Sequence, residues 1–251
     1  MENNKETAYK GFVLNGFLAL ILALALIAAA IYFFVRADSD GEFAILGVLS
    51  MALFALCTNG FVKLEPNEAM VLLFFGKYRG TFTQDGFYWV NPLLSKKKVS
   101  LRARNLNPEP IKVNDKVGNP VLIGMVLVWK LEDTYKALFE IDSQSLAPVG
   151  NVGKGSNARY LSQAFENFVR VQSDAALRQV AGCYAYDNPD TPDELTLRSN
   201  ADEINEKLVA TLNERLAMAG IHVTEARINY LAYAPEIAAV MLRRQQADAI
   251  I

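Results

Sequence analysis

The chain has 251 residues, of which 52% are hydrophobic, and its 25 basic side chains nearly balance its 27 acidic ones. This balance argues against bulk binding of nucleic acid, because a phosphate backbone needs clustered lysine and arginine in excess. The two cysteines, Cys57 and Cys183, provide neither a disulfide framework nor the ligand spacing of a zinc site.

Two long uncharged runs occupy the first quarter of the chain. One extends from Phe12 to Val35 and the other from Phe43 to Val62. Each is long enough for the about 20 apolar residues that a helix needs to cross the hydrocarbon of a bilayer. The first run is also too long for the apolar region of a signal peptide. The sequence therefore predicts a membrane anchor made of two hydrophobic helices.

The connector between the runs, Arg36 to Glu42, is short and acidic, which predicts a hairpin whose two outer ends lie on the same side of the membrane. Five basic residues gather on that side, namely Lys5, Lys10, Lys63, Lys77 and Arg79. The positive-inside rule then places the rest of the chain in the cytoplasm, as part of a multi-pass protein of the inner (cytoplasmic) membrane. A re-entrant hairpin that never crosses stays open as an alternative, because Asn59 and Gly60 weaken the end of the second run.

Short strand-like runs separated by glycine and proline follow from Leu64 to Leu131, and they predict antiparallel strands with short links. Two of these runs, MVLLFF and VLIGMVLV, do not alternate apolar with polar residues, so both faces of their strands should be covered. In the part nearest the membrane we expect one covered face to meet helices or lipid. The candidates for membrane-proximal contact are Phe87, Tyr88 and Trp89.

After Asp133 the pattern becomes helical, with helices predicted over TYKALFE, ENFVRVQSDAALRQVAG and SNADEINEKLVATLNERLAMAG. The last of these carries one apolar stripe with a residue at every fourth position, formed by Ile204, Leu208, Leu212 and Leu216. Asn200 with Glu203 is typical of a capping box at a helix start, and Gly220 is typical of a helix stop. A strand, IHVTEARIN, is predicted next.

A final helix is predicted from Pro235, and its apolar stripe is narrow. The candidates for an oligomer interface on it are Ile237, Val240, Met241, Arg243 and Arg244. Such a stripe would be buried by neighbouring copies in a ring. The alternative is a solvated helix that leads to a further domain, and because the chain reaches Ile251 without a stop signal, we expect more helix or more protein to follow.

Motifs of catalytic or metal chemistry are weak in this sequence. GNVGKGS, residues 150–156, lacks the Gly-Lys-Ser/Thr order of a phosphate-binding loop, and DNPDTPDE, residues 187–194, lacks the spacing of a calcium loop. His222 is the only histidine and no nucleophile motif accompanies it. The lysine run 96–98 is either a site for anionic head groups or a solvated strand end. We therefore expect no enzymatic activity, no cofactor and no metal.

An ordered series of motifs extends along the chain after the two apolar runs: EPNEAMVLLFFGKYRGT, DGFYWVNPL, VSLRARNL, IKVNDKVGNPV, VWKLED, SDAALRQVAG, LNERLAMAGIHVTEARI and APEIAAVMLRRQQA. This series resembles the SPFH or band 7 family, which includes stomatin, prohibitin, flotillin and the HflK and HflC proteins. The resemblance runs from about Leu64 to Ile251 and is closest to the bacterial stomatin-like (slipin) proteins. Residues 143–163 look like an insertion relative to the family pattern.

This resemblance implies an α/β (α+β) domain of antiparallel strands and packed helices, preceded by the helical hairpin and followed by the start of a long helix that becomes a coiled coil in relatives. The expected division is an anchor at 1–63, a strand-rich subdomain at 64–132, a second subdomain at 133–234 and the final helix at 235–251. It further implies a non-enzymatic scaffold that forms a large ring or cage of its own copies, contacts membrane lipids and organises a membrane microdomain or shields membrane proteins. The alternative is a regulatory subunit that docks on a membrane protease.

Overall fold

The structure is a computed structural model, and it describes residues 5–36, 41–141, 157–187 and 195–248. The chain forms two compact units, Met1–Ser100 and Leu101–Ile251. Long helices and antiparallel strands occur together, so the predicted mixed class with antiparallel sheets and packed helices is confirmed.

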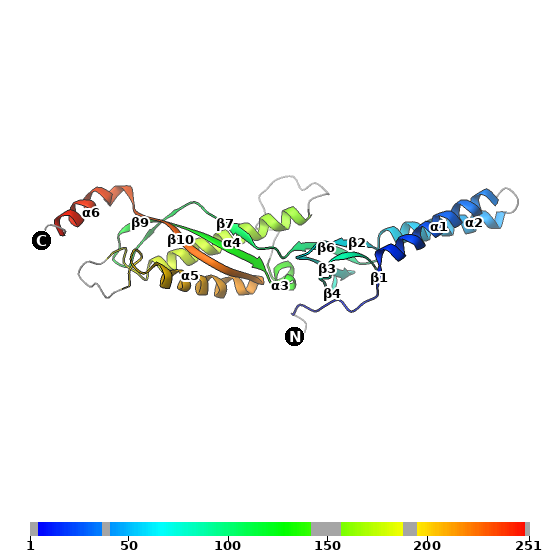
Figure 1. The fold of residues 1–251 in the computed structure, drawn as a ribbon, viewed down its shortest axis with the longest axis horizontal. Helices are drawn as coiled ribbons and strands as arrows, with labels where there is room; N and C mark the ends of the chain where they lie inside the picture. Colours follow the sequence, from blue (N-terminus) through cyan, green and yellow to red (C-terminus); the bar gives the residue numbers. More distant parts are fainter. Residues whose placement is uncertain (1–4, 37–40, 142–156, 188–194, 249–251) are drawn as a thin grey trace. The chain divides into compact units, whose positions relative to one another are not determined.

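The first unit begins with two apolar helices that lie side by side, α1 (Gly16–Arg36) and α2 (Gly41–Thr58) (Figure 1). Three alanines form the buried face of α1, and small side chains of this kind let helices approach closely. Most of the large apolar side chains on both helices remain outside any protein core, as Ile21 at 64% and Ile45 at 71% exposure illustrate. In a soluble helical hairpin, large apolar side chains of this kind would be buried between the helices or against the rest of the protein.

The strands of the first unit form two three-stranded antiparallel sheets. One has the order β1 (Val13–Asn15), β5 (Gly86–Val90), β2 (Phe61–Leu64), and the other has the order β4 (Lys77–Phe82), β3 (Glu68–Phe74), β6 (Ser95–Ser100). The five residues at the centre of β3, 69–73, are all buried, which confirms that both faces of this strand are covered. The hydrophobic core of the unit consists of Val62, Leu64, Met70, Leu72, Phe82, Val90 and Leu94.

The outer ends of the two predicted membrane runs lie outside the helices. Phe12 directly precedes β1, and Val62 lies in β2 with 4% of its surface exposed. The anchor helices are therefore shorter than the apolar runs, whereas Val35 and Phe43 do lie in α1 and α2. The physical reason is that both flanks pair with β5, so strand pairing takes residues whose composition alone would suit a helix.

The second unit contains a sheet whose long central strand is β9 (Pro120–Leu131). It pairs on one side with β10 (Ile221–Tyr233) and on the other with β7 (Arg104–Leu106) and β8 (Ile111–Asn114). Its residues alternate between buried and half-buried, and none is exposed, as the unbroken apolar run predicts.

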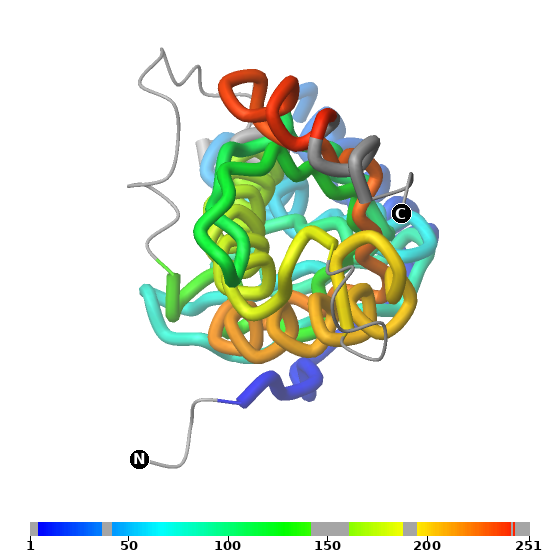
Figure 2. Tube along the Cα trace, turned by 90° about the vertical axis from the view of Figure 1, so that its left-hand side faces the viewer, coloured from blue at the N-terminus to red at the C-terminus, as the bar shows by residue number. Residues whose placement is uncertain are grey.

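The helices of the second unit are α3 (Thr134–Phe139), α4 (Asn157–Ala181), α5 (Ala201–Leu216), a 3-10 turn η1 (Ala217–Ala219) and α6 (Pro235–Asp248). Helices α4 and α5 are adjacent, and Figure 2 shows them as neighbouring yellow-green and orange coils, with the red α6 on the other side of the unit from α5. The four residues of the predicted α5 stripe are all fully buried.

The ends of α5 and of the following turn lie where the sequence predicts them, but the predicted capping hydrogen bond does not form at Asn200. Asn200 precedes α5 as expected, yet its side chain makes no capping hydrogen bond, because its Oδ1 accepts from Ser199 Oγ instead. Gly220 ends the following turn at φ 62°, where a Cβ would lie 2.3 Å from the carbonyl oxygen of Asp133. A glycine is therefore required there by conformation and by space.

Two boundaries differ from those expected. Helix α4 begins at Asn157, inside the segment 143–163 that looked like an insertion and nine residues before the predicted start at Glu166; residues 142–156 lie outside the described part. The division at Ser100 also differs from the predicted boundary at residue 132. The reason is that β9 pairs along almost its whole length with β10, which joins strands from both predicted subdomains in one sheet.

Candidate membrane-anchoring site

Helix α1 has the dimensions of a membrane span. Within the described residues it is the one helix that is both long and apolar enough to cross a bilayer, whereas Glu42–Thr58 of α2 is apolar but shorter. At about 1.5 Å per residue, α1 covers about 30 Å, which matches the thickness of the hydrocarbon, and Glu42–Thr58 covers about 25 Å. The pair is thus one clear span beside a shorter apolar partner.

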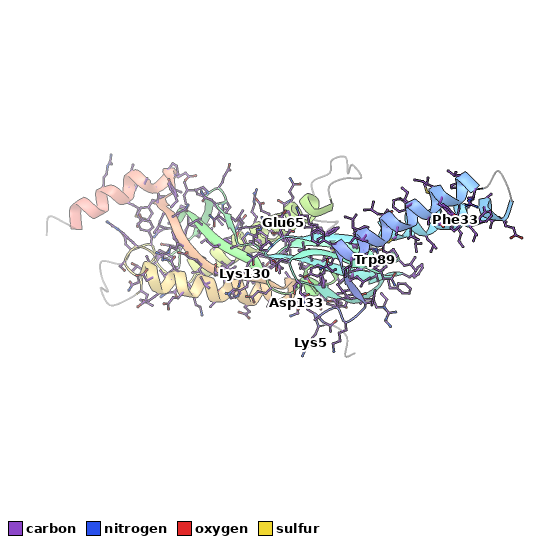
Figure 3. The ribbon with its side chains drawn as sticks, turned by 45° about the vertical axis from the view of Figure 1, so that its right-hand side comes forward. Lys5, Phe33, Glu65, Trp89, Lys130 and Asp133 are labelled. Atoms are coloured by element: carbon purple, nitrogen blue, oxygen red, sulfur yellow. The ribbon has the colours of Figure 1, made fainter. Side chains whose placement is uncertain are left out.

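Aromatic side chains gather at both ends of this hairpin. At the far end, Phe33 and Phe43 stack at 6.3 Å between ring centroids, and the guanidinium of Arg36 lies 5.6 Å from the ring centroid of Tyr32. At the near end Trp89 lies where the strands meet the helices, and Figure 3 shows Phe33 and Trp89 at opposite ends of the hairpin. Such paired aromatic belts are typical of the two water boundaries of a bilayer.

The sheet β1-β5-β2 holds both chain ends of the hairpin. Strand β1 leads directly into α1, β2 follows α2 after Asn59 and Gly60, and each pairs with an opposite edge of β5. The residues before the first helix and those after the second are therefore fixed in one sheet. Both lie at the same end of the hairpin, as the short connector predicted.

The two faces of this sheet have different surroundings. On one face Phe87 stacks on Phe61 at 5.5 Å and meets Phe17 of α1 edge-on at 5.5 Å. On the other face Val62, Leu64 and Val90 belong to the core of the unit. The strands alternate because successive side chains of a β-strand point to opposite faces. The sheet thus has an aromatic face in contact with α1 at the foot of the apolar hairpin and an opposite face that belongs to the core of the unit.

Two polar contacts fasten β5 and β6 to the end of α2. The indole Nε1 of Trp89 donates to the carbonyl oxygen of Cys57 at 2.8 Å, and Nζ of Lys96 donates to the carbonyl oxygen of Asn59. The Cys57 carbonyl also accepts from Gly60 N at 3.0 Å, and Asn59 lies just after the last residue of α2, so the two contacts hold the turn that follows the helix. Burial lowers the pKa of Lys96. This lysine therefore binds the turn after α2, a third possibility besides the two predicted for the run 96–98.

The structure brings together two of the three predicted membrane-proximal aromatics. Phe87 and Trp89 are half-buried on the aromatic face. Tyr88 points to the opposite face, where its ring meets Phe82 edge-on at 5.1 Å and packs against the core. Strand alternation separates Tyr88 from its neighbours, so it does not share their surroundings. Sequence reasoning missed two further aromatic contacts of Phe87: Phe61, which strand pairing places on the same face of the sheet, and Phe17 of α1, which packs against that face.

The predicted interface residues on α6 occupy one exposed element. Ile237 and Met241 are half-buried, Val240 is 66% exposed and Arg243 is exposed. The side chain of Arg244 lies outside the described part. The start of α6 is held by an ion pair of 2.5 Å between Lys112 and Glu236. Its apolar residues therefore have little cover within the second unit.

The motifs weighed for chemistry give no assembled site in the described part of the chain. His222 is half-buried in β10, where its backbone pairs with Lys130. Among the described residues no group of three or more potential metal ligands is found, whereas most of 150–156 and 187–194 lies outside that range.

Comparison with known proteins agrees with this arrangement. The model of one protein family, described as SPFH domain / Band 7 family, matches residues 62–251. No curated protein gives a significant match. The match begins at the second residue of β2, where the chain leaves α2, and it covers the remaining strands and helices. The chain therefore belongs to the SPFH / band 7 family.

Proposed function

We propose that this protein is a non-enzymatic membrane scaffold. Its helical hairpin fixes each copy in the bilayer with the SPFH domain on the cytoplasmic face, lateral contacts between domains close a large ring, and the enclosed patch of membrane is segregated from the rest. Membrane proteins inside that patch are shielded or concentrated. Membership of the stomatin-like subgroup stays a prediction.

The observation that carries the proposal is the sheet β1-β5-β2. It connects the hairpin to the family domain without a linker, because β2 is both the continuation of α2 and the first element of that domain. The part of the family domain that belongs to the first unit, residues 62–100, is held against the hairpin in this way, which supports a role at the membrane itself.

The exposed stripe on α6 supports self-association. Val240 projects an apolar side chain into solvent at 66% exposure, next to the exposed charge of Arg243. Apolar residues at helical spacing beside charged ones favour packing of equivalent helices, with a heterologous contact that a ring can close.

The first experiment is the mass of the full-length protein in mild detergent, measured by native electrophoresis and by particle imaging. A uniform particle of many copies is expected. Val240→Glu should reduce the particle size by placing a charge in the stripe, whereas Ala239→Glu, on the opposite side of the helix, should leave it unchanged. A monomer or dimer that is stable across detergents would contradict the ring. Together with one membrane protease recovered in equal amount, it would favour the regulatory subunit.

A further inference from the structure

The segment before α1 makes a bridge over the two sheets of the first unit. Its start is bonded to β4, because Tyr9 N donates to Thr81 O at 3.0 Å and Thr81 N donates to Thr7 O at 2.8 Å. Its end is β1, which pairs with β5. Residues 10–12 therefore pass from one sheet to the other, and a cavity of about 470 Å³ lies beneath them. This volume is in the range of small-molecule sites.

A glycine makes this bridge possible. Gly80 in β4 has φ 135°, and a Cβ on it would lie 2.7 Å from Cα of Tyr9. The segment can therefore approach β4 only because position 80 has no side chain. The cavity beside this approach is open to solvent, because Lys10, Phe12 and Arg79 in its lining are exposed.

The cavity is divided between positive and apolar side chains. Lys10 and Arg79 line it, and no acidic side chain does. Phe12, Phe74 and Leu94 give much of the remaining wall an apolar character, and Tyr9 and Asn91 add polar groups. A ligand that matches this lining has a negative charge at one end and hydrocarbon at the other.

The two charges are available for a ligand. Within the part of the chain that the structure describes, neither Lys10 nor Arg79 forms an ion pair. Arg79 is oriented by Phe74, whose ring centroid lies 5.4 Å from its Cζ. Burial raises the pKa of the nearby Tyr9 phenol, while the charge of Arg79 acts to lower it, so Tyr9 keeps its proton and is available as a donor.

The position of the cavity favours a lipid over a soluble anion. Phe12 is four residues before the start of α1, at most about 13 Å along an extended chain. Beside Phe74, the ring of Phe75 lies edge-on at 4.8 Å, is 86% exposed, and is held at φ 47°, a conformation that bulky residues rarely adopt. An apolar surface next to the cavity, at the depth of the head groups, suits an acyl chain and not water.

We propose that this cavity binds an anionic phospholipid, with its phosphate between Lys10 and Arg79 and the start of an acyl chain against Phe12, Phe74 and Leu94. The inference rests on the proposed membrane anchoring but not on ring formation. If each copy binds one such molecule, the scaffold would concentrate anionic phospholipid next to each hairpin.

The test uses the full chain in mixed micelles that contain equal amounts of phosphatidylglycerol and phosphatidylcholine. After gel filtration in lipid-free detergent, the retained lipids are identified by mass spectrometry and counted by phosphorus analysis. Phosphatidylglycerol should be retained preferentially, at about one molecule per chain. Lys10→Gln combined with Arg79→Gln should reduce its retention at least fivefold, since each basic residue near a lipid surface contributes about a factor of five.

Two variants serve as matched controls. Lys77→Gln removes an exposed charge from the same strand, outside the cavity, and should retain lipid like the wild type. Arg79→Lys keeps the charge at position 79 and should also retain lipid. Equal retention by the double variant, or equal retention of both lipids, would overturn the proposal. Full displacement of the lipid by millimolar glycerol phosphate would also overturn it, because the site would then recognise a soluble phosphate. Particle size, measured in the same preparations, reports on the ring separately.

Discussion

Two asparagine side chains of α5 replace backbone partners that β10 lacks. Nδ2 of Asn213 donates to Val223 O at 3.1 Å and its Oδ1 accepts from Val223 N at 2.8 Å, while Oδ1 of Asn205 accepts from Ile228 N at 3.0 Å. Val223 and Ile228 are the residues at which the pairing of β10 with β9 shifts register. A bulge leaves backbone groups unpaired, and here a helix supplies the missing amide partners.

We expect Asn213→Ala to lower the free energy of unfolding by about 1–3 kcal/mol, because it leaves a buried N–H and a carbonyl without partners. Glu214→Ala, at the next and exposed position, should change it by less than about 0.5 kcal/mol. Urea unfolding of the full chain in detergent, followed by the fluorescence of Trp129 in a Trp89→Phe background, measures both. Equal effects of the two substitutions would show that the amide pairing is not what holds α5 to the strand.

Tyr233 makes the second unit sensitive to alkaline pH. Its hydroxyl donates to Oδ1 of Asp187 at 2.9 Å, and its ring centroid lies 4.0 Å from that of Tyr186. Burial raises the pKa of Tyr233, and the hydrogen bond to the Asp187 carboxylate and its charge raise it further. The folded protein therefore keeps a proton that the unfolded chain loses at about pH 10.

Because the folded state binds this proton more tightly, its contribution to stability is complete below about pH 10 and declines as the pH rises further. The wild type should lose stability between pH 10 and pH 11.5 more steeply than Tyr233→Phe, which has no phenol to ionise. Urea unfolding at several pH values in this range compares the two slopes. Parallel curves would rule out Tyr233 as the origin of the alkaline decline.

At the scale of elements, the aromatic face of β1-β5-β2 predicts where lipid begins. Trp89 lies on that face at the end of α2, whereas Trp129 in β9 is 1% exposed. In bilayers of brominated phospholipid we expect the fluorescence of a Trp129→Phe variant, which reports on Trp89 alone, to be quenched substantially. The fluorescence of Trp89→Phe, which reports on Trp129 alone, should change little. Quenching confined to the second variant would place the aromatic face away from the membrane.

Elements whose signal is local could be predicted from the sequence. The stripe of α5, the stop at Gly220 and the limits of β5 follow from spacing, conformation and turn residues within a few positions. Strand β1 could not be predicted, because its three residues continue an apolar run and only the distant β5 selects the extended form. The start of α4 was missed for another reason, since residues 157–163 belong to the segment 143–163 that looked like an insertion.

The candidate site could be predicted only in part, because its residues come from segments that are distant in sequence. The hairpin follows from hydropathy, and Lys10 and Arg79 are recognisable as charges on the domain side of the membrane. That these two line one cavity depends on the pairing of residues 7–9 with β4, to which they are distant in sequence. No pattern within either segment carries that information, apart from a glycine at position 80.

At the scale of the whole molecule, the two cysteines allow the topology to be tested. Cys57 is buried in α2 and Cys183 is exposed in the second unit. In a Cys57→Ala background, Cys183 should react with an impermeant maleimide in inverted membrane vesicles and not in intact cells. With Cys183 also replaced by alanine, Ser39→Cys in the connector should show the opposite pattern if the hairpin crosses the membrane. Labelling of Ser39→Cys from the cytoplasmic side would instead favour the re-entrant hairpin.

The strand order of the first sheet also sets the sequence of events in biogenesis. Its two edge strands flank the hairpin, but the central strand β5 is synthesised only after both helices and three further strands. Neither edge strand has a partner in that sheet until then, so both helices are synthesised before the strands that flank them can pair. Closing the sheet afterwards joins β1 to a strand about 75 residues later in the chain, which carries an entropic cost. The finished sheet fixes both ends of the hairpin to the same unit, because either end can separate from it only if β5 releases β1 or β2.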